Sequence, residues 1–305
     1  MLSIASPACV APTGDWCGEG AVWHASENSL YWTDINRFLI HRFDSLARSV
    51  ETWFFDEPVT SMILTHRNDT LAVTLGSRVI LWKPSTDERR DLGYHVPGWP
   101  KVRSNDARAD SRGSLWLGTM RNNVYPDGTP GEAGGTDGFL VRIDPGGAVS
   151  EWKRGMGIAN TVAWSPDHTR FYFADTLLNE VYVYDYDQST GNIAGERKFF
   201  ADFPRGKPDG STVDSEGYLW NCRYGGHAIV RVAPSGEIDR VIEMPVSNIT
   251  TCTFGGEDLT TLYVTTAALG TVPGERLSGS LFAIETNVQG QPENRFRASA
   301  QAAAS

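Results

Sequence analysis

The sequence predicts an all-β fold, a six-bladed β-propeller in a single domain. Two observations support this prediction. Short strands rich in aromatic and β-branched residues alternate with turn residues along the chain, and they form one unit that recurs six times. Each unit begins with a polar or small residue, here called its head, which is followed by a short apolar strand, a turn and a second strand. The six heads are Glu19, Ser61, Asn105, Asn160, Asp209 and Thr251.

The spacing of the heads favours a propeller over other all-β folds. Successive heads are 42, 44, 55, 49 and 42 residues apart. A repeat of about 40–50 residues with about four strands is typical of a propeller blade. The alternative is a β-sandwich with coincidental spacing, but sandwich strands do not usually return at such regular offsets over six periods.

The fourth unit, residues 158–187, shows the design most clearly. It consists of an innermost strand at 161–164, a Ser-Pro-Asp turn, and strands at 170–174 and 180–186. The first turn of every unit is rich in Gly, Asn, Asp, Ser or Pro, as hairpins require. In chain order, the second strands are expected near residues 30–32, 71–73, 115–117, 171–173, 219–220 and 262–264. The third strands are expected near residues 38–43, 78–82, 139–143, 180–186, 228–232 and 280–284.

The two ends of the chain have separate places in this prediction. Residues 3–10 precede the first head and are expected to add the outer strand of the last blade, which closes the ring and hides its edges. One propeller domain is expected over residues 1–286, because no linker rich in Pro, Gly or Ser divides the chain. Residues 287–305 end in RASAQAAAS and are expected to form a flexible tail.

Composition and charge exclude several classes of protein. A net charge of −10 and a pI near 5.1 argue against nucleic acid or an anionic membrane as the main partner. The N-terminal residues lack the features of a secretory signal, and no run approaches the ~20 apolar residues of a membrane span. The four cysteines form no CxxC pair, which suits reduced thiols. A cytoplasmic protein is therefore expected, with its oligomeric state left open.

The heads are expected to meet at one end of the central channel, because the innermost strand of each blade lines that channel. Glu19, Asn160 and Asp209 together offer carboxylate and amide oxygens there. Crowded carboxylates repel one another unless a cation or a shared proton offsets them. Oxygen-only ligands favour a hard divalent ion. The alternative is that these polar residues only hydrogen-bond water along the axis.

Other chemistries receive little support from the sequence. The six histidines form no HxH or HExxH pair, and there is no GxSxG motif for a serine nucleophile. The third unit is the longest, and its extra length falls between Met120 and Gly138. Long loops in compact domains are often lids or binding loops. The residues from 121 to 138 are therefore expected to cover the site, although a surface insertion is the alternative.

Five segments resemble the family of senescence marker protein, regucalcin and gluconolactonase. They occur in the order and spacing of that family, between about Gly14 and Ile284. The segments are CGEGAVW at 17–23, RSNDARAD at 103–110 with LWLGTM at 115–120, GIAN at 157–160 with ADT at 174–176, PDG at 208–210 with VDSEGYLW at 213–220, and FGG at 254–256 with LYVTT at 262–266.

The resemblance implies a six-bladed propeller with one catalytic divalent metal ion at the channel mouth. The metal ligands of the family fall on Glu19, Asn160 and Asp209, and the residues that contact its substrate fall on Arg103 and Asn105. The metal could be Ca2+, Zn2+, Mn2+ or Mg2+. One position departs from the family. Where vertebrate members carry a substrate-binding Glu after Gly-Thr-Met, this chain has Asn123, so the sugar preference of those members does not carry over.

The activity implied is hydrolysis of a sugar lactone, an aldono-1,4- or 1,5-lactone, to the aldonic acid in sugar catabolism. The metal would act as Lewis acid on the lactone carbonyl, and Asp209 would be the general base for the attacking water. Arg103 would hold substrate hydroxyls or developing charge, and Asn105 would orient the substrate or complete the metal shell. Two alternatives stay open: a calcium-binding regulatory protein without turnover, and a metal-dependent hydrolase of organophosphates or non-sugar lactones.

Overall fold

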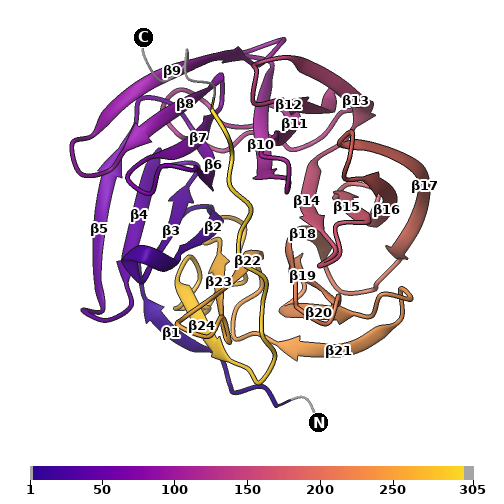
Figure 1. The fold of residues 1–305 in the computed structure, drawn as a ribbon. Coiled ribbons are helices and arrows are strands. Elements are labelled where there is room, and N and C mark those ends of the chain that lie inside the picture. Colours follow the sequence, from indigo (N-terminus) through magenta and orange to yellow (C-terminus); the bar gives the residue numbers. More distant parts are fainter. Residues whose placement is uncertain (1–2, 299–305) are drawn as a thin grey trace.

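The computed structural model describes residues 3–298 and shows six four-stranded antiparallel sheets arranged around a central axis (Figure 1). Each sheet is one blade, with its first strand innermost. The described residues contain one short 3-10 helix, η1 (Ala25–Glu27), and no α-helix. Within this part of the chain no helix has the length and apolar character needed to cross a membrane. The predicted six-bladed β-propeller is confirmed.

The strand bounds follow the order of the chain. Blade 1 consists of β2 (Gly18–His24), β3 (Ser29–Asp34), β4 (Leu39–Asp44) and β5 (Ser49–Phe54). Blade 2 consists of β6 (Val59–Leu64), β7 (Leu71–Leu75), β8 (Arg78–Lys83) and β9 (Glu88–His95). Blade 3 consists of β10 (Val102–Ala109), β11 (Leu115–Arg121), β12 (Gly138–Ile143) and β13 (Val149–Met156).

Blades 4 and 5 repeat this pattern, and blade 6 takes its outer strand from the N-terminus. Blade 4 consists of β14 (Ala159–Trp164), β15 (Arg170–Asp175), β16 (Glu180–Asp187) and β17 (Asn192–Ala201). Blade 5 consists of β18 (Lys207–Val213), β19 (Leu219–Tyr224), β20 (Ala228–Val232) and β21 (Ile238–Glu243). Blade 6 consists of β22 (Ile249–Gly255), β23 (Thr261–Thr266), β24 (Leu281–Glu285) and β1 (Ala8–Ala11).

The ring closes between its first and last strands, as expected. β1 pairs antiparallel with β24, with Ala8 opposite Ala283 and Cys9 opposite Phe282. The outer strand of blade 6 therefore comes from the other end of the chain, next to blade 1 (Figure 1). This pairing joins the two ends of the chain in one blade and so closes the ring. It also covers the strand edge that blade 6 would otherwise expose.

A buried aspartate recurs in the first turn of blades 3 and 5 and explains why Asp, Gly and Leu-Trp recur in the sequence. Trp116 Nε1 donates to Asp110 Oδ2 at 2.9 Å, and Trp220 Nε1 donates to Asp214 Oδ2 at 2.8 Å. The other oxygen of each carboxylate accepts backbone N–H groups of its own turn. Asp214 also binds Arg231, whose Nη2 lies 2.7 Å from Oδ2. Each aspartate thus ties its turn to the tryptophan of the following strand.

Replacing Asp214 with alanine is expected to lower the free energy of unfolding by about 3–5 kcal/mol, the usual cost of removing one partner of a buried ion pair. Asp214 is fully buried and Arg231 is 3% exposed, so the substitution leaves a buried guanidinium and an indole N–H short of an acceptor. Asp110→Ala is the matched control, because Asp110 accepts from Trp116 and Tyr186 but binds no basic side chain among residues 3–298. Urea denaturation should show the larger loss for Asp214→Ala; equal losses would contradict the role given to the ion pair.

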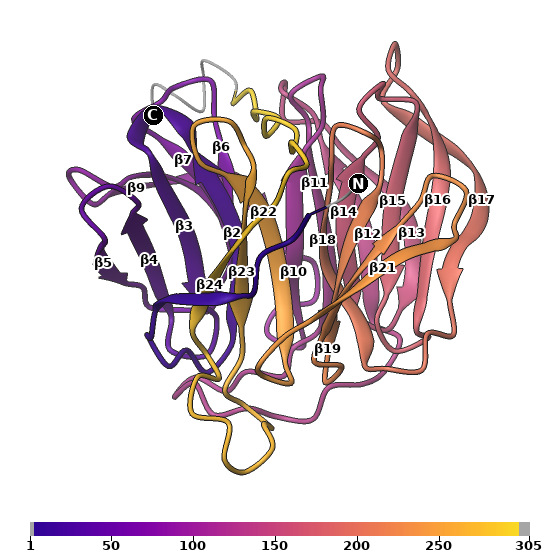
Figure 2. The same ribbon diagram turned by 90° about the horizontal axis from the view of Figure 1, so that it is seen from below.

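The chain after blade 6 differs from the expected flexible tail over residues 287–298. This segment, yellow in Figure 1, crosses the end of the channel where the innermost strands finish (Figures 1 and 2). Gln291 Nε2 donates to the carbonyl of Val213, Glu293 forms an ion pair with Arg108, and Phe296 is 2% exposed. Phe296 also forms a parallel bridge with Thr65. The partners lie far away in sequence, which is why composition alone suggested a tail. Residues 299–305 lie outside the described part of the chain.

Candidate functional site

The six innermost strands begin at the end of the channel opposite the C-terminal segment, and their pairing is irregular at the heads. In β14, Asn160 pairs with Ala174, and regular pairing resumes only at Ala163. The other five innermost strands have similar register shifts at or beside their heads. Such bulges bend a strand and redirect its side chains. The side chains of the heads are therefore directed differently from those of residues in regular strands.

Two bulges use a left-handed backbone directly after the head. Gly20 follows Glu19 with φ of 60°, and Thr161 follows Asn160 with φ of 58°. A β-branched residue rarely adopts this conformation. Thr161 is held there by its side chain, because its Oγ1 donates to the Asp209 carbonyl and lies 2.9 Å from Ser211 Oγ. Backbone strain of this kind concentrates at functional sites.

A continuous chain of hydrogen bonds joins five of the six predicted site residues. Arg103 Nη2 donates to Asn123 Oδ1 at 2.9 Å, and its Nη1 donates to Asn105 Oδ1 at 2.8 Å. Asn105 Nδ2 donates to Asn160 Oδ1 at 3.0 Å. Asn160 Nδ2 in turn donates to Asp209 Oδ1 at 2.7 Å. Residues from three blades and one loop thus meet in one polar network.

The sixth residue, Glu19, joins the network through Asp209. Burial, followed by the nearby Asp106 carboxylate, raises the pKa of Glu19 to about 8. Burial also raises the pKa of Asp209, and the Glu19 carboxylate beside it adds to the rise. Glu19 Oε2 accepts the N–H of Gly20 at 2.8 Å. Asp209, which is buried, and Glu19, which is half-buried, therefore lie side by side, and the nearby Arg103 and Arg108 only partly offset the repulsion between their carboxylates.

The donor set at this position suits a divalent cation. Glu19, Asn160 and Asp209 supply oxygens from three blades, and a cation between the two carboxylates would relieve the repulsion that raises their pKa values. Asn160 presents its Nδ2 to Asp209, so it serves as a ligand only with its carboxamide rotated. Between residues 3 and 298 no three His, Cys, Asp or Glu side chains gather into a metal site. The candidate set depends on the amide oxygen as its third ligand.

Arg103 is fixed before any substrate arrives. Its side chain is 4% exposed, and burial lowers its pKa to about 10, against the attraction of Cys17, Glu19 and Asp209. Its Nη1 also donates to the carbonyl of Ser104 at 2.7 Å. All three guanidinium nitrogens are engaged, so the planar fork has one orientation.

Lysine at position 103 is not expected to substitute for arginine. It keeps a positive charge but cannot donate to Asn105 and Asn123 at once, because it lacks the planar fork. Arg103→Lys should lower kcat/KM toward a lactone substrate by more than about tenfold while metal affinity changes little. Steady-state kinetics with metal titration by calorimetry separates the two effects. An unchanged kcat/KM would remove Arg103 from the site.

The sequence did not single out three further residues at this position. Asp106 follows the head Asn105 inside the same bulge, accepts the N–H of Val162 at 3.2 Å, and has its own pKa raised by burial. Cys17 lies beside Glu19 and Asp209, and burial raises the pKa of its thiol. Thr176 Oγ1 accepts from Asn160 Nδ2 at 2.9 Å. All three fall within segments that resemble the family, which is the signal that could have identified them.

The long loop between β11 and β12 is anchored beside the site. Val124 pairs with Pro130 across the loop and is 6% exposed in a cluster with Phe38 of blade 1. Asn36 Nδ2 donates to the carbonyl of Gly128 at 2.8 Å. The first half of the loop therefore reaches from blade 3 across blade 2 to blade 1 and forms a fixed wall. Asn123 is the residue of this wall that contacts Arg103.

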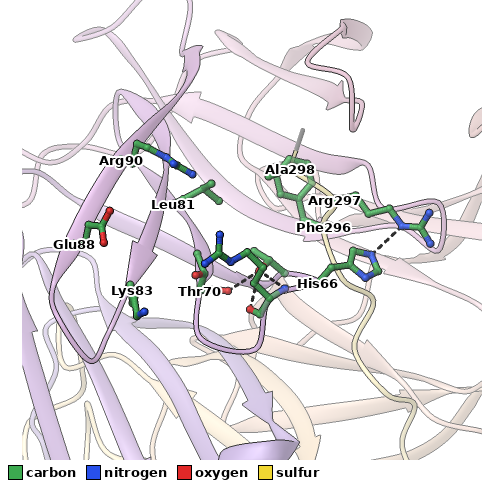
Figure 3. A pocket seen from close by; sticks show the side chains of 11 residues that line it. His66, Thr70, Leu81, Lys83, Glu88, Arg90, Phe296, Arg297 and Ala298 are labelled. Atoms are coloured by element: carbon green, nitrogen blue, oxygen red, sulfur yellow. Dashed lines mark hydrogen bonds between the residues drawn. The ribbon is translucent and has the colours of Figure 1, made fainter. Parts of the chain in front are cut away.

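Of two large pockets in the described part of the chain, one borders the site. A pocket of about 540 Å3 is lined by Asn123 and by aromatic residues of the adjoining loops. The other, of about 470 Å3, lies at the opposite end of the channel and is lined by Leu81, Arg90 and Phe296, with Arg297 hydrogen-bonded to His66 (Figure 3). It contains none of the predicted site residues. The first pocket therefore adjoins the network through Asn123, the one predicted site residue that lines it.

Comparisons with known proteins agree with this architecture. Residues 17–268 match the model of the SMP-30/Gluconolactonase/LRE-like region. The pentonolactonase XacC of Haloferax volcanii is 35% identical over 301 residues, which cover 94% of this chain and 96% of that protein. Human regucalcin is 31% identical over 267 residues, covering 87% of this chain and 88% of regucalcin.

Solved structures show the same fold. A luciferin-regenerating enzyme superimposes with a TM-score of 0.86 at 26% identity, covering 97% of this chain and all of that chain. Regucalcin from Agrobacterium tumefaciens, described as a calcium-binding protein, superimposes with a TM-score of 0.88 at 24% identity, covering 96% of this chain and 98% of that chain. With a matching family model over most of its length, the chain belongs to the SMP-30/gluconolactonase/LRE-like family.

Proposed function

We propose that this protein hydrolyses a sugar lactone, an aldono-1,4- or 1,5-lactone, to the aldonic acid in a reaction that depends on a divalent metal ion. The observation that carries the proposal is the buried network in which Arg103, Asn105 and Asn160 lead to the paired carboxylates of Glu19 and Asp209. Membership of the family and the resemblance to a pentonolactonase support the same reaction class.

A divalent ion bound by Glu19, Asn160 and Asp209 would supply Lewis-acid stabilisation of the oxyanion that develops from the lactone carbonyl, and it would keep both carboxylates ionised. Asp209 accepts the proton of the attacking water as general base. Its carboxylate is 8% exposed, so little bulk water competes for it.

The rest of the network binds and orients the sugar. Asn123 Oδ1 accepts from Arg103, while Asn123 Nδ2 has no hydrogen-bond partner within residues 3–298 and is available to a substrate hydroxyl. Asn105 is hydrogen-bonded to both Arg103 and Asn160 and orients the sugar relative to Asp209. Neutral lactones need no electrostatic steering, which agrees with a net charge of −10.

The proposal is tested with purified protein treated with a chelator and then supplied with Ca2+, Zn2+, Mn2+ or Mg2+. A panel of pentono- and hexonolactones in 1,4- and 1,5-ring forms is followed by acid release in a weakly buffered indicator assay. We expect lactone hydrolysis that disappears with chelator and returns with at least one ion. Full activity after chelation would contradict the metal dependence.

The same assay separates the alternative functions. Tight Ca2+ binding without turnover of any lactone would favour a calcium-binding protein. Faster hydrolysis of organophosphates or non-sugar lactones than of aldonolactones would favour a metal-dependent hydrolase of those substrates. Either result would contradict the proposed substrate class.

A further inference from the structure

The pocket beside Asn123 has the size and position of a second substrate-binding region. Its volume of about 540 Å3 lies within the 300–1,000 Å3 typical of ligand pockets. Its walls are the fixed loop after β11, the segment before β10 that contains Trp99, and the segment before β6 that contains Asp56. Asn123 lies on this wall and also binds Arg103, so the pocket adjoins the network proposed to hold the lactone.

Two exposed aromatic rings line the pocket. Trp99 is 38% exposed and Tyr125 is 59% exposed. Each ring lies against a glycine: a Cβ on Gly76 would come within 2.8 Å of Trp99 Cζ3, and a Cβ on Gly131 within 3.4 Å of Tyr125 Cε2. The glycines allow the rings to lie close to the backbone, so they are supported from behind while remaining open to a ligand. Rigid rings of this kind offer contact area at low entropic cost.

The polar groups of the pocket are mostly acceptors. Glu57 is already engaged, because its carboxylate receives Arg78 Nη1 at 2.6 Å and the N–H of Ser77 at 2.9 Å. Asp56 and Glu132 bind no partner within the described residues. Ionised carboxylates only accept hydrogen bonds, so they select ligands rich in hydroxyl donors and disfavour anions.

Arg121 also lines the pocket, but its positive charge does not make the pocket favour anions. Arg121 is paired with Asp137, with Nε 2.7 Å from Oδ2. The exposed aromatic rings and the carboxylate acceptors together favour a neutral ligand that carries hydroxyl groups and has a ring able to stack on an aromatic side chain. A sugar ring has both properties.

We propose, resting on the lactonase function above, that this pocket is a subsite for a second sugar, and that the substrates include aldonolactones carrying a glycosyl substituent. The lactone ring would lie at Arg103 and Asp209, and the attached sugar would contact Trp99 and Tyr125. The loop is anchored by Asn36 and by the buried Val124, so the subsite is already formed and little ordering is needed on binding.

The experiment compares two lactones that share one lactone ring, glucono-1,5-lactone and cellobiono-1,5-lactone, with the metal ion that best supports activity. We expect a higher kcat/KM for the cellobiose-derived lactone in the native protein. Trp99→Ala and Tyr125→Ala should each lower the ratio of the two kcat/KM values by about tenfold, which corresponds to about 1.4 kcal/mol. Phe54→Ala is the matched control, because Phe54 is an aromatic residue 65% exposed on β5 and outside the pocket.

A second measurement keeps the two proposals distinct. Cellobiose has no lactone, so its binding to the chelated protein, measured by titration calorimetry, reports the subsite alone and should be lost in Trp99→Ala. If neither lactone is hydrolysed, the proposed function fails. If the lactones are hydrolysed but the ratio is the same in the native protein and both variants, the subsite is overturned while the lactonase function stands. Circular dichroism and melting temperature confirm that each variant is folded.

Discussion

Asp209→Asn is expected to lower lactone hydrolysis by about 10²–10⁴-fold, the usual contribution of a general base. Asparagine has nearly the same volume, and its amide oxygen can take the place of one carboxylate oxygen as a ligand of the metal ion. The variant loses only the basic carboxylate, so it should still bind the metal ion, with reduced affinity. Turnover is measured at saturating metal to separate the base from the ligand.

Asn160→Asp is the control for this prediction. It changes the charge of the same network without removing a base, and we expect it to lower turnover less than Asp209→Asn does. Near-native turnover of Asp209→Asn at saturating metal would show that Asp209 is only a ligand. The proton would then have to leave the attacking water by another route, although lactone hydrolysis itself could still stand.

Glu19→Gln is expected to weaken metal binding by about 100-fold or more while leaving the metal-free protein at least as stable as the native one. Glu19 is half-buried beside Asp209 and Asp106, and its pKa of about 8 means that without a cation it is mostly protonated near neutral pH, so the neutral glutamine replaces it at little cost. A ligand present at 100 times its Kd stabilises a protein by about 2.7 kcal/mol, and most of that gain disappears when affinity falls 100-fold.

Thermal melting with and without the divalent ion measures both effects. The native protein should gain a large shift in Tm from the ion, and Glu19→Gln a small one. Glu275→Gln is the matched control, because Glu275 receives Ser247 and Ser278 but lies outside the proposed ligand set. A metal-free Glu19→Gln protein that melts well below the native one, with its metal shift intact, would contradict the placement of the ion.

Much of the candidate site followed from the sequence because the propeller repeats. Once Glu19, Asn160 and Asp209 were recognised as equivalent heads, their meeting at one end of the axis was a consequence of the fold, and the structure brings them together there. Their roles as ligands and base stay predictions. Arg103 was reached only through the resemblance, since no repeat position marks it. Its contact with Asn123 links β10 to a loop. A contact of this kind does not recur from blade to blade, so the repeat does not reveal it.

The sequence by itself determined the number of blades, the innermost strands and the positions of their heads, because these depend on short-range hydrogen bonding and on a repeat that every blade obeys. Tertiary structure alone decided three features. Residues 287–298 pack across the channel because Phe296 and Glu293 find their partners in blades 2 and 3. The loop after β11 is a fixed wall because Asn36 of blade 1 binds Gly128. The pocket beside Asn123 exists because segments before β6, before β10 and after β11 converge. Each depends on contacts between residues distant in sequence, whose meeting is set by the closed ring and not by local pattern.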